Sequence, residues 1–337
     1  MRQLFFSRTC ATSRRWLSSS TQQHLRPPRR RPPQHIVFGS CSSQYESQQC
    51  WKTIQAQNPD LLVLMGDNVY AQESSDIHAA YQSWGASSAW KSLAASVPVL
   101  ATLDDNDYTT DHETGKQAFL DFFKISGEDE RRQAGRGVHV CTSWGDGDDR
   151  SLQLILLDVR YYAKNSCLLG DDQWDWLRSC LDDEKQEQPS LRVIVSPMQV
   201  LATGHPWECW DRNAPTEREM LLDLLRSNRT PTLLVSGDRH VGALHEQQQH
   251  SLEDDDENDE SIVEMTTSSL THSVFPPGIL DAELDVSRRD PSHRVEGYFY
   301  DNNFGSIQVD WTQRRVTVAL HRVQDGSILA AWKRPFG

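Results

Sequence analysis

Short apolar runs that end abruptly in small or metal-binding residues recur along the chain. The clearest is Leu61–Met65, which is followed directly by Gly66, Asp67 and Asn68. Runs of this length, bounded by turn residues, are typical of buried strands. Three more runs end in the same way, in the segments 39–41, 104–107 and 237–240. Since ligands of open α/β sheets bind at the carboxyl ends of strands, the pattern predicts an α/β fold with one metal site assembled from distant segments.

The periodicity of the remaining chain predicts further elements. Helices are expected at residues 46–57, 77–94, 215–225 and from residue 170 onward. Further strands are expected at 138–142, 152–158, 191–197, 262–267, 305–310 and 315–322, with antiparallel pairing at the C-terminus. The segment at about 246–260 is polar, strongly charged and without periodicity. We therefore interpret it as a disordered acidic insertion.

Length and composition restrict the class of protein. The chain has 337 residues and 37% hydrophobic content, so it can bury a sizeable core. No apolar run approaches the roughly 18 residues that span a bilayer, so no membrane partner is expected. The seven cysteines are scattered without C-x-x-C spacing, which argues against a disulfide framework and fits a reducing compartment.

Charge is distributed unevenly along the chain. The net charge is −14, but the first 35 residues contain eight arginines and no Asp, Glu or Lys, so the remainder carries −22. An acidic body disfavours a nucleic-acid partner. It fits a protein that binds a small anionic ligand at a local cationic site.

The Arg- and Ser-rich, acid-free N-terminus predicts a targeting peptide. We assign residues 1–34 to a transit peptide with a Pro/Arg-rich linker, and residues 35–337 to one domain. The arginine pair at 14–15 lies just before Trp-Leu-Ser-Ser-Ser, as in mitochondrial processing sites. No continuous apolar core of about 7 residues, which a secretory signal needs, is found. A mitochondrial location is predicted, while plastid import and an untargeted, cytoplasmic arm stay open.

A series of motifs follows in order along the chain: FGSCS (38–42), GDNVY (66–70), LDDNDY (103–108), LDVRYY (157–162), PMQVL (197–201), SGDRH (236–240) and TSSLTH (267–272). Together they resemble the alkaline phosphatase D-type (PhoD-like) metallophosphatases of the calcineurin-like metallophosphoesterase superfamily. The resemblance covers about residues 35–322. No single motif is decisive, but their common order and spacing make chance agreement improbable.

The resemblance implies a fold and a chemistry. The fold would be the calcineurin-like metallophosphoesterase fold, an α/β architecture of two packed mixed β-sheets flanked by helices. The function would be that of a phosphatase or phosphodiesterase with a centre of two metal ions, Fe³⁺ and Ca²⁺ in this family. The residue types agree, because thiolate and phenolate suit a trivalent or borderline metal and carboxylates suit a hard cation. Other divalent metals are also compatible with these ligands.

Matching of motif positions assigns individual residues. The iron ligands would be Cys41, Asp67, Tyr70 and His240. Asp67 would bridge to the second metal, with Asp105 and Asp238 on that side. The candidates for contacting the substrate phosphate or the reacting groups are Arg160, Arg239, His205 and Asn106. Each residue also has a structural alternative, since buried Cys packs as a small hydrophobe and an Arg after a strand often pairs with a structural carboxylate.

The third motif departs from the family pattern. Relatives carry DDHD, whereas Asn106 stands at the position of the His that protonates the leaving group in the wider superfamily. An amide cannot act as an acid, and loss of general acid catalysis typically costs ~10²–10⁴-fold in rate. Two functions stay open: a phosphoesterase that favours good leaving groups, and a catalytically impaired metal-binding protein of the same fold. The substrate and the oligomeric state are not determined by the sequence.

Overall fold

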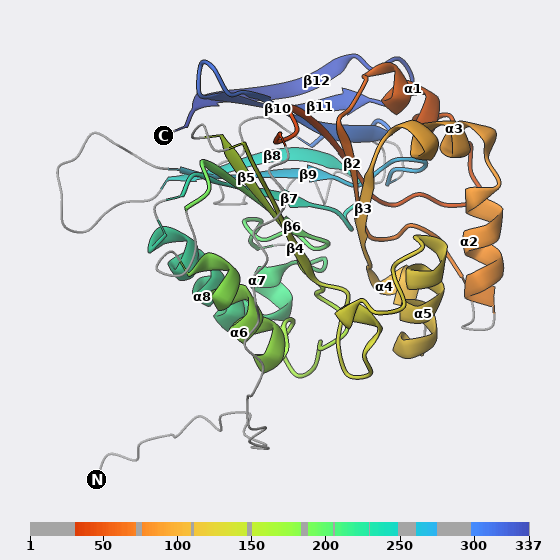
Figure 1. The fold of residues 1–337 in the computed structure, drawn as a ribbon, viewed down its shortest axis with the longest axis horizontal. Coiled ribbons are helices and arrows are strands. Elements are labelled where there is room, and N and C mark those ends of the chain that lie inside the picture. The colour runs from red at the N-terminus through yellow and green to blue at the C-terminus, as the bar shows by residue number, and fades with distance from the viewer. Residues whose placement is uncertain are drawn as a thin grey trace, which may run out of the picture.

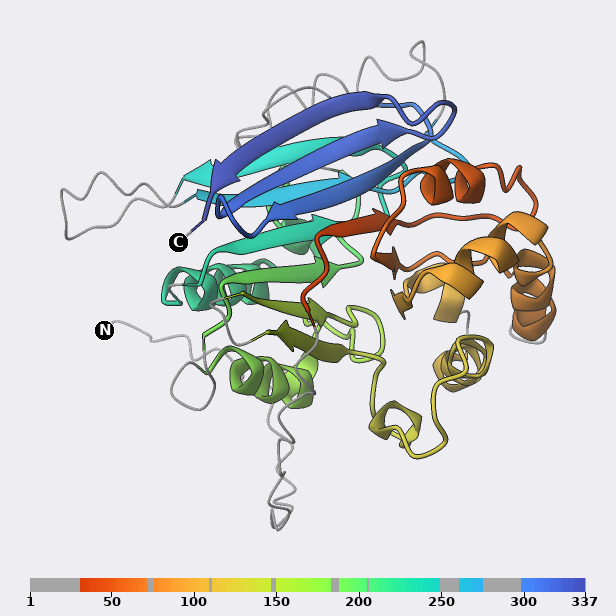
Figure 2. The ribbon, with the colours of Figure 1, turned by 45° about the horizontal axis from the view of Figure 1, so that its top comes forward.

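The computed structural model describes residues 31–71, 76–108, 111–146, 150–182, 188–204, 206–228, 230–248, 261–274 and 298–336. Within these residues, two six-stranded sheets pack in layers with helices on their outer sides (Figures 1 and 2). This arrangement agrees with the predicted α/β fold of two packed mixed sheets. Most of the predicted transit peptide, at residues 1–30, and residues 249–260 of the acidic insertion lie outside the described residues.

The first sheet has the strand order β12-β11-β10-β1-β2-β3. Strands β1, β2 and β3 pair in parallel, and β10, β11 and β12 add an antiparallel series on the other side of β1. The bounds are β1 His35–Gly39, β2 Leu61–Met65, β3 Val99–Thr102, β10 Asn303–Asp310, β11 Arg315–Arg322 and β12 Ile328–Pro335. Every residue of β2 is buried, because a strand covered on both faces reads as a continuous apolar run.

The second sheet has the order β4-β5-β6-β7-β9-β8. Its four central strands are parallel, and β4 and β8 form antiparallel edges. The bounds are β4 Val140–Gly145, β5 Ser151–Leu156, β6 Leu191–Ser196, β7 Thr232–Ser236, β8 Gly242–Gln248 and β9 Ser261–Thr267. The strands predicted at 152–158, 191–197 and 262–267 are therefore present within one or two residues, whereas the one predicted at 138–142 is β4, which ends three residues later.

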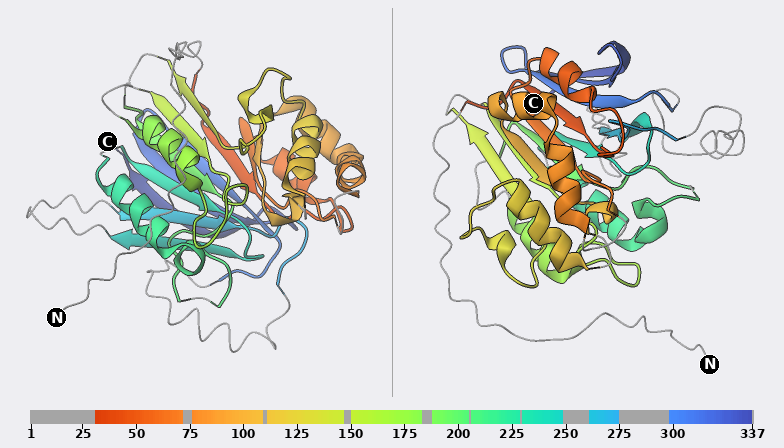
Figure 3. Two further views of the ribbon diagram at one scale, coloured as in Figure 1. Left: turned by 90° about the horizontal axis from the view of Figure 1, so that it is seen from below. Right: turned by 90° about the vertical axis from the view of Figure 1, so that its right-hand side faces the viewer.

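Alternation of side chains along the strands builds three cores. Phe38 and Val63 of the first sheet and Val193 and Val235 of the second face each other between the sheets. Neighbouring residues on the opposite faces pack against helices. The first sheet packs on α1 Cys50–Ala56, α2 Ile77–Gly85, α3 Ser88–Ser96, α4 Asp105–Tyr108 and α5 His112–Phe122. The second packs on α6 Gly170–Leu181, α7 Trp210–Asn213 and α8 Pro215–Arg226, which lie on the opposite side of the molecule (Figure 3).

Other predicted elements differ more in the structure. The helix expected at 46–57 begins only at Cys50, as α1. The helix expected at 77–94 is two helices, because α2 ends at Gly85 and Ser87 caps α3 by accepting a hydrogen bond from the backbone N–H of Trp90. The acidic insertion, expected from about residue 246, begins later, since residues 242–248 form β8. Backbone pairing with β9 does not require apolar side chains. The polar sequence of this edge strand therefore did not show the alternation that predicts a strand.

Close packing of α5 against α4 fixes the segment 104–107. A Cβ atom on Gly115 would lie 2.5 Å from the backbone oxygen of Asp107 and 2.7 Å from that of Tyr108. We expect Gly115→Ala to lower the free energy of unfolding by about 1–3 kcal/mol, because neither backbone oxygen can move without shifting α4. Denaturant unfolding measures this effect. Gly127→Ala is the control, since no atom lies within 4 Å of its Cβ position, and an equal loss there would contradict the packing argument.

Candidate metal centre

The residues that follow the parallel strands of both sheets lie together at the carboxyl ends of these strands. Cys41 follows β1, Asp67 follows β2, and Asp238 and His240 follow β7. These four non-glycine residues have φ angles of 58°, 51°, 67° and 53°, in the left-handed region. Each such conformation costs on the order of 1–3 kcal/mol and persists where the surrounding structure requires it. Strained backbone at four residues after three converging strand ends points to a functional site.

One group of potential metal ligands combines sulfur, nitrogen and oxygen. Ligand atoms of Cys41, Asp67 and His240 all lie within 4.8 Å of one another. Cys41 Sγ is 3.8 Å from Asp67 Oδ2. The hydroxyl of Tyr70 donates to the same carboxylate oxygen at 3.0 Å and lies 3.2 Å from His240 Nε2. The structure therefore brings together the four side chains predicted as iron ligands.

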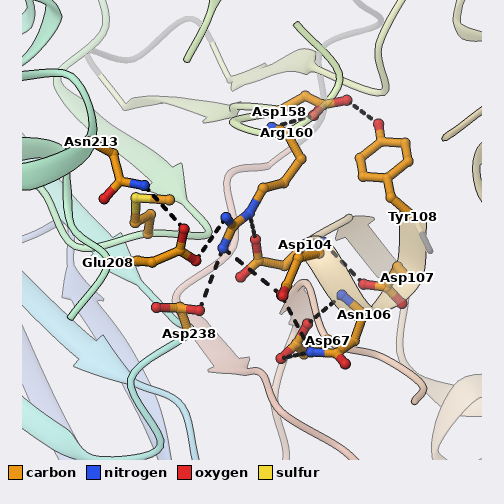
Figure 4. Close-up of polar contacts among 12 residues, drawn as sticks. Asp67, Asp104, Asn106, Asp107, Tyr108, Asp158, Arg160, Glu208, Asn213 and Asp238 are labelled. Atoms are coloured by element: carbon orange, nitrogen blue, oxygen red, sulfur yellow. Dashed lines mark hydrogen bonds and ion pairs between the residues drawn. The ribbon is translucent and has the colours of Figure 1, made fainter. Parts of the chain in front are cut away.

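A second group of potential ligands consists of carboxylates. Oxygen atoms of Asp67, Asp104 and Asp105 lie within 4.8 Å of one another, so Asp67 belongs to both groups. Asp104 is fully buried, and no hydrogen-bond donor of the described residues reaches its Oδ2. Asn106 Nδ2 donates to Asp67 Oδ2 at 3.0 Å (Figure 4). It also donates to Asp105 Oδ1 at 3.3 Å. An orphaned buried carboxylate oxygen is costly unless a cation binds it, so this group fits a hard metal ion.

Arg160 approaches the second group from the segment after β5. Its guanidinium lies between Asp104, Asp238 and Glu208 (Figure 4). Nε forms an ion pair with Asp104, Nη1 contacts Glu208 at 2.9 Å and Nη2 contacts Asp238 at 3.5 Å. Asp238, predicted as a ligand of the second metal, therefore lies on that side of the site.

Asp107 ties the loops after β2 and β3 together. It accepts hydrogen bonds from the backbone N–H groups of Asn68 at 3.1 Å, Val69 at 3.3 Å and Asp104 at 3.1 Å. The hydroxyl of Tyr81 donates to it at 2.8 Å. Burial raises the pKa of Asp107 to about 7, although these donors oppose the shift. A single buried carboxylate thus holds two ligand-bearing loops in register.

Burial and crowding of acids shift the protonation equilibria of the site. Burial, with repulsion from Asp104, raises the pKa of Asp238 to about 8, and burial raises that of Asp104 to about 6. Burial also raises the pKa values of Asp67 and the Cys41 thiol. Burial lowers the pKa of His240 to about 4, so its imidazole is neutral and able to bind a metal. Bound cations reverse such shifts for acids, because they favour the anionic forms.

His205 and Arg239 are the remaining predicted site residues. His205 lies outside the described residues. Arg239 follows Asp238 in the chain, and its guanidinium lies 5.2 Å from the centroid of the Trp207 ring. Sequence reasoning missed Asp104 and His272 as site residues, although both lie inside recognised motifs. The His272 ring centroid is 5.1 Å from that of Tyr70 and 4.4 Å from that of His240.

The fold and the paired ligand groups define a metallophosphatase-type α/β sandwich. Residues 79–320, more than half of the chain, match the sequence model of the PhoD-like phosphatases. The chain belongs to this family of metal-dependent hydrolases that act on phosphoric esters. Within the described residues, no helix is both long and apolar enough to cross a membrane.

Solved structures support the fold. A structure of PhoD is similar with a TM-score of 0.65 and 14% identity, over 91% of this chain and 70% of that chain. A purple acid phosphatase, PPD1, from yellow lupin (Lupinus luteus) seeds has a TM-score of 0.61 and 14% identity, over 91% of this chain and 54% of its own. Direct comparison with curated protein sequences gave no match.

Membership of Asp67 in both ligand groups predicts a specific metal stoichiometry. We expect Asp67→Asn to lose both metal equivalents and to reduce turnover at least ~100-fold, because both groups lose their shared charged ligand. Asp105→Asn should lower only the equivalent bound by the carboxylate group. Metal analysis of purified variants measures this difference. Asp172→Asn, an exposed substitution in the first turn of α6, is the control. Full metal content in Asp67→Asn would contradict the shared-ligand assignment.

Proposed function

We propose that the protein hydrolyses small phosphate esters at a binuclear metal centre in which Asp67 is the bridging ligand. The observation that carries this proposal is the presence of Asp67 in two ligand groups of different chemistry. The group with Cys41 and His240 suits a trivalent or borderline metal such as iron. The group with Asp104 and Asp105 suits a hard cation such as calcium. When bound, two such ions stabilise the attacking and leaving oxygens and lower the pKa of bound water.

The residues around the metals have distinct tasks in this proposal. Tyr70 would join Cys41 and His240 as a phenolate ligand of the first metal. Asn106 donates to Asp67 Oδ2 at 3.0 Å, which fixes the orientation of the bridging carboxylate. Arg160 and Arg239 supply guanidinium groups, which bind phosphate oxygens in a bidentate manner. Partial burial of the site strengthens the attraction between these guanidinium groups and a phosphate, because the local dielectric is lower than in water.

The nature of residue 106 supports substrates with good leaving groups. The Asn106 amide has no acidic proton to transfer, and its hydrogen bonds go to two carboxylates. Aryl esters and anhydrides need little protonation of the leaving group. The same observation supports a second candidate, a metal-binding protein of this fold without turnover. Assays of metal-loaded protein with aryl mono- and diesters distinguish the two, since only the enzyme turns over.

The proposed leaving-group preference is tested by restoring an acid. We expect wild-type protein to show a steep dependence of rate on leaving-group pKa. Asn106→His should increase turnover of alkyl esters by up to ~10²–10⁴-fold and change aryl ester rates much less. Steady-state kinetics over a series of esters measure both effects.

Asn106→Ala is the matched control for this substitution. It removes the hydrogen bonds to the carboxylates without supplying an acid, so it should weaken metal binding and give no gain on alkyl esters. Equal gains of Asn106→His on both ester classes would show that the proton comes from another group. His205 would then be the first residue to test.

We further propose mitochondrial import through the basic N-terminus. Contacts made by the backbone of Gln34 with Asp60 and Val309 support an ordered domain that begins near this point. Removal of residues 1–30 should therefore leave the melting temperature unchanged and abolish import, measured by unfolding and by fractionation of cells. Import of the shortened protein, or its aggregation, would refute the proposal. Plastid targeting would appear in the same fractionation.

A further inference from the structure

Arg160 contacts four carboxylates at once. Besides its ion pair with Asp104, its Nη1 lies 2.9 Å from Glu208 and its Nη2 lies 3.5 Å from Asp238 and 3.9 Å from Asp105. The side chain is only 12% exposed, and that of Asp104 only 1%. All three guanidinium nitrogens are thus directed at protein oxygens (Figure 4). An arginine that served only to bind substrate phosphate would keep donors available for it.

The carboxylates that Arg160 contacts overlap with the second group of potential metal ligands. Asp104 and Asp105 belong to both sets, and Asp238 is the family-matched ligand on the same side. One guanidinium carries a single positive charge, whereas it contacts four carboxyl groups. Asp104 Oδ2 also has no donor among the described residues. Arg160 therefore compensates this group only in part, and a divalent cation would compensate it better.

We propose that Arg160 is a built-in counter-cation that competes with the second metal ion for Asp104, Asp105 and Asp238. The inference rests on the proposed two-metal centre. Arg and a divalent cation differ in how they use these oxygens, because a guanidinium needs planar hydrogen bonds whereas a cation gathers six to eight oxygens around itself. Both are positively charged and attracted to the same carboxylates, so a cation bound at open oxygens such as Asp104 Oδ2 repels the guanidinium and weakens its contacts.

Glu208 keeps hold of Arg160 when the guanidinium gives up its contacts with the metal-binding aspartates. It contacts Nη1 from the more exposed side, with a side-chain exposure of 46%. Asn213 Nδ2 holds the other oxygen of Glu208 at 3.0 Å. In the competed state, Nε and Nη2 become available to a phosphate group near the metals. Binding of the second metal and the availability of an arginine for substrate are thereby coupled.

The competition is tested by Ca²⁺ binding in the absence of substrate. Protein treated with EGTA and dialysed is titrated with Ca²⁺ in a calorimeter. We expect Arg160→Gln to bind Ca²⁺ on the order of 10-fold more tightly than wild type, within the usual range of coupling between sites. Arg160→Lys should lie between the two, because an ammonium keeps the charge but cannot bridge several carboxylates. Arg239→Gln is the matched control, since it removes an equal charge next to Asp238 in the chain.

Thermal unfolding gives a second readout. Without divalent cation, Arg160→Gln should melt below wild type, because buried carboxylates lose their counter-cation. Saturating Ca²⁺ should raise its melting temperature more than that of wild type. If Arg160→Gln folds only with Ca²⁺, the proposal is supported directly, and Arg160→Lys still provides an affinity that must exceed that of wild type.

Three results would overturn the proposal. The first is unchanged or weaker Ca²⁺ binding by Arg160→Gln. The second is an equal gain in Ca²⁺ affinity by Arg239→Gln, which would indicate only general electrostatics. The third is the absence of Ca²⁺ binding in every variant. None of these measurements involves turnover. A protein without phosphoesterase activity that shows the Arg160 effect would therefore disprove the proposed function and leave the competition intact.

Discussion

Buried negative charge at the shared edge of the two sheets is the constraint on which the site depends. Asp67 and Asp104 are almost completely buried, and Asp105 and Asp238 lie close to them. Each buried carboxylate costs several kcal/mol unless an opposite charge or hydrogen-bond donors compensate it. Among the described residues, Arg160 is the cation in contact with this cluster through most of its nitrogens. Protons or bound cations supply the rest of the compensation, since burial raises the pKa values of Asp67, Asp104 and Asp238 and a bound cation favours their anionic forms. Metal binding is therefore part of the stability of the site as well as of its chemistry.

Rigid backbone supports this charged cluster. Parallel pairing brings the ends of β1 and β2, and of β6 and β7, to the same level, and Asp107 joins the loops that follow β2 and β3. The left-handed conformations at the strand ends are maintained because these contacts leave little alternative. Asn106 belongs to the same support, since its amide donates to two carboxylates. Asn106, which stands at the position of the acid in related proteins, therefore helps to orient Asp67 and Asp105.

Most of the fold follows from local sequence patterns. The apolar runs predicted the central strands, and the strand-end residues predicted where a metal would bind. The patterns did not predict β8 or β12, whose residues are largely polar or mixed and whose pairing is provided by neighbouring strands. They also joined α2 and α3, because an amphipathic pattern continues across Ser87 although its side chain begins a new helix.

The sequence by itself determined the candidate ligands Cys41, Asp67 and His240, through the match of family motifs that lie shortly after predicted strands. Only the tertiary structure decided which of them share space: that Asp67 joins two ligand groups, that Asp104 belongs to one of them, and that Arg160 spans the carboxylates. The physical reason is the distance along the sequence over which the interacting residues are separated. Strand formation depends on residues a few positions apart, whereas Asp104 and Arg160 meet across 56 residues, through the packing of one sheet on the other.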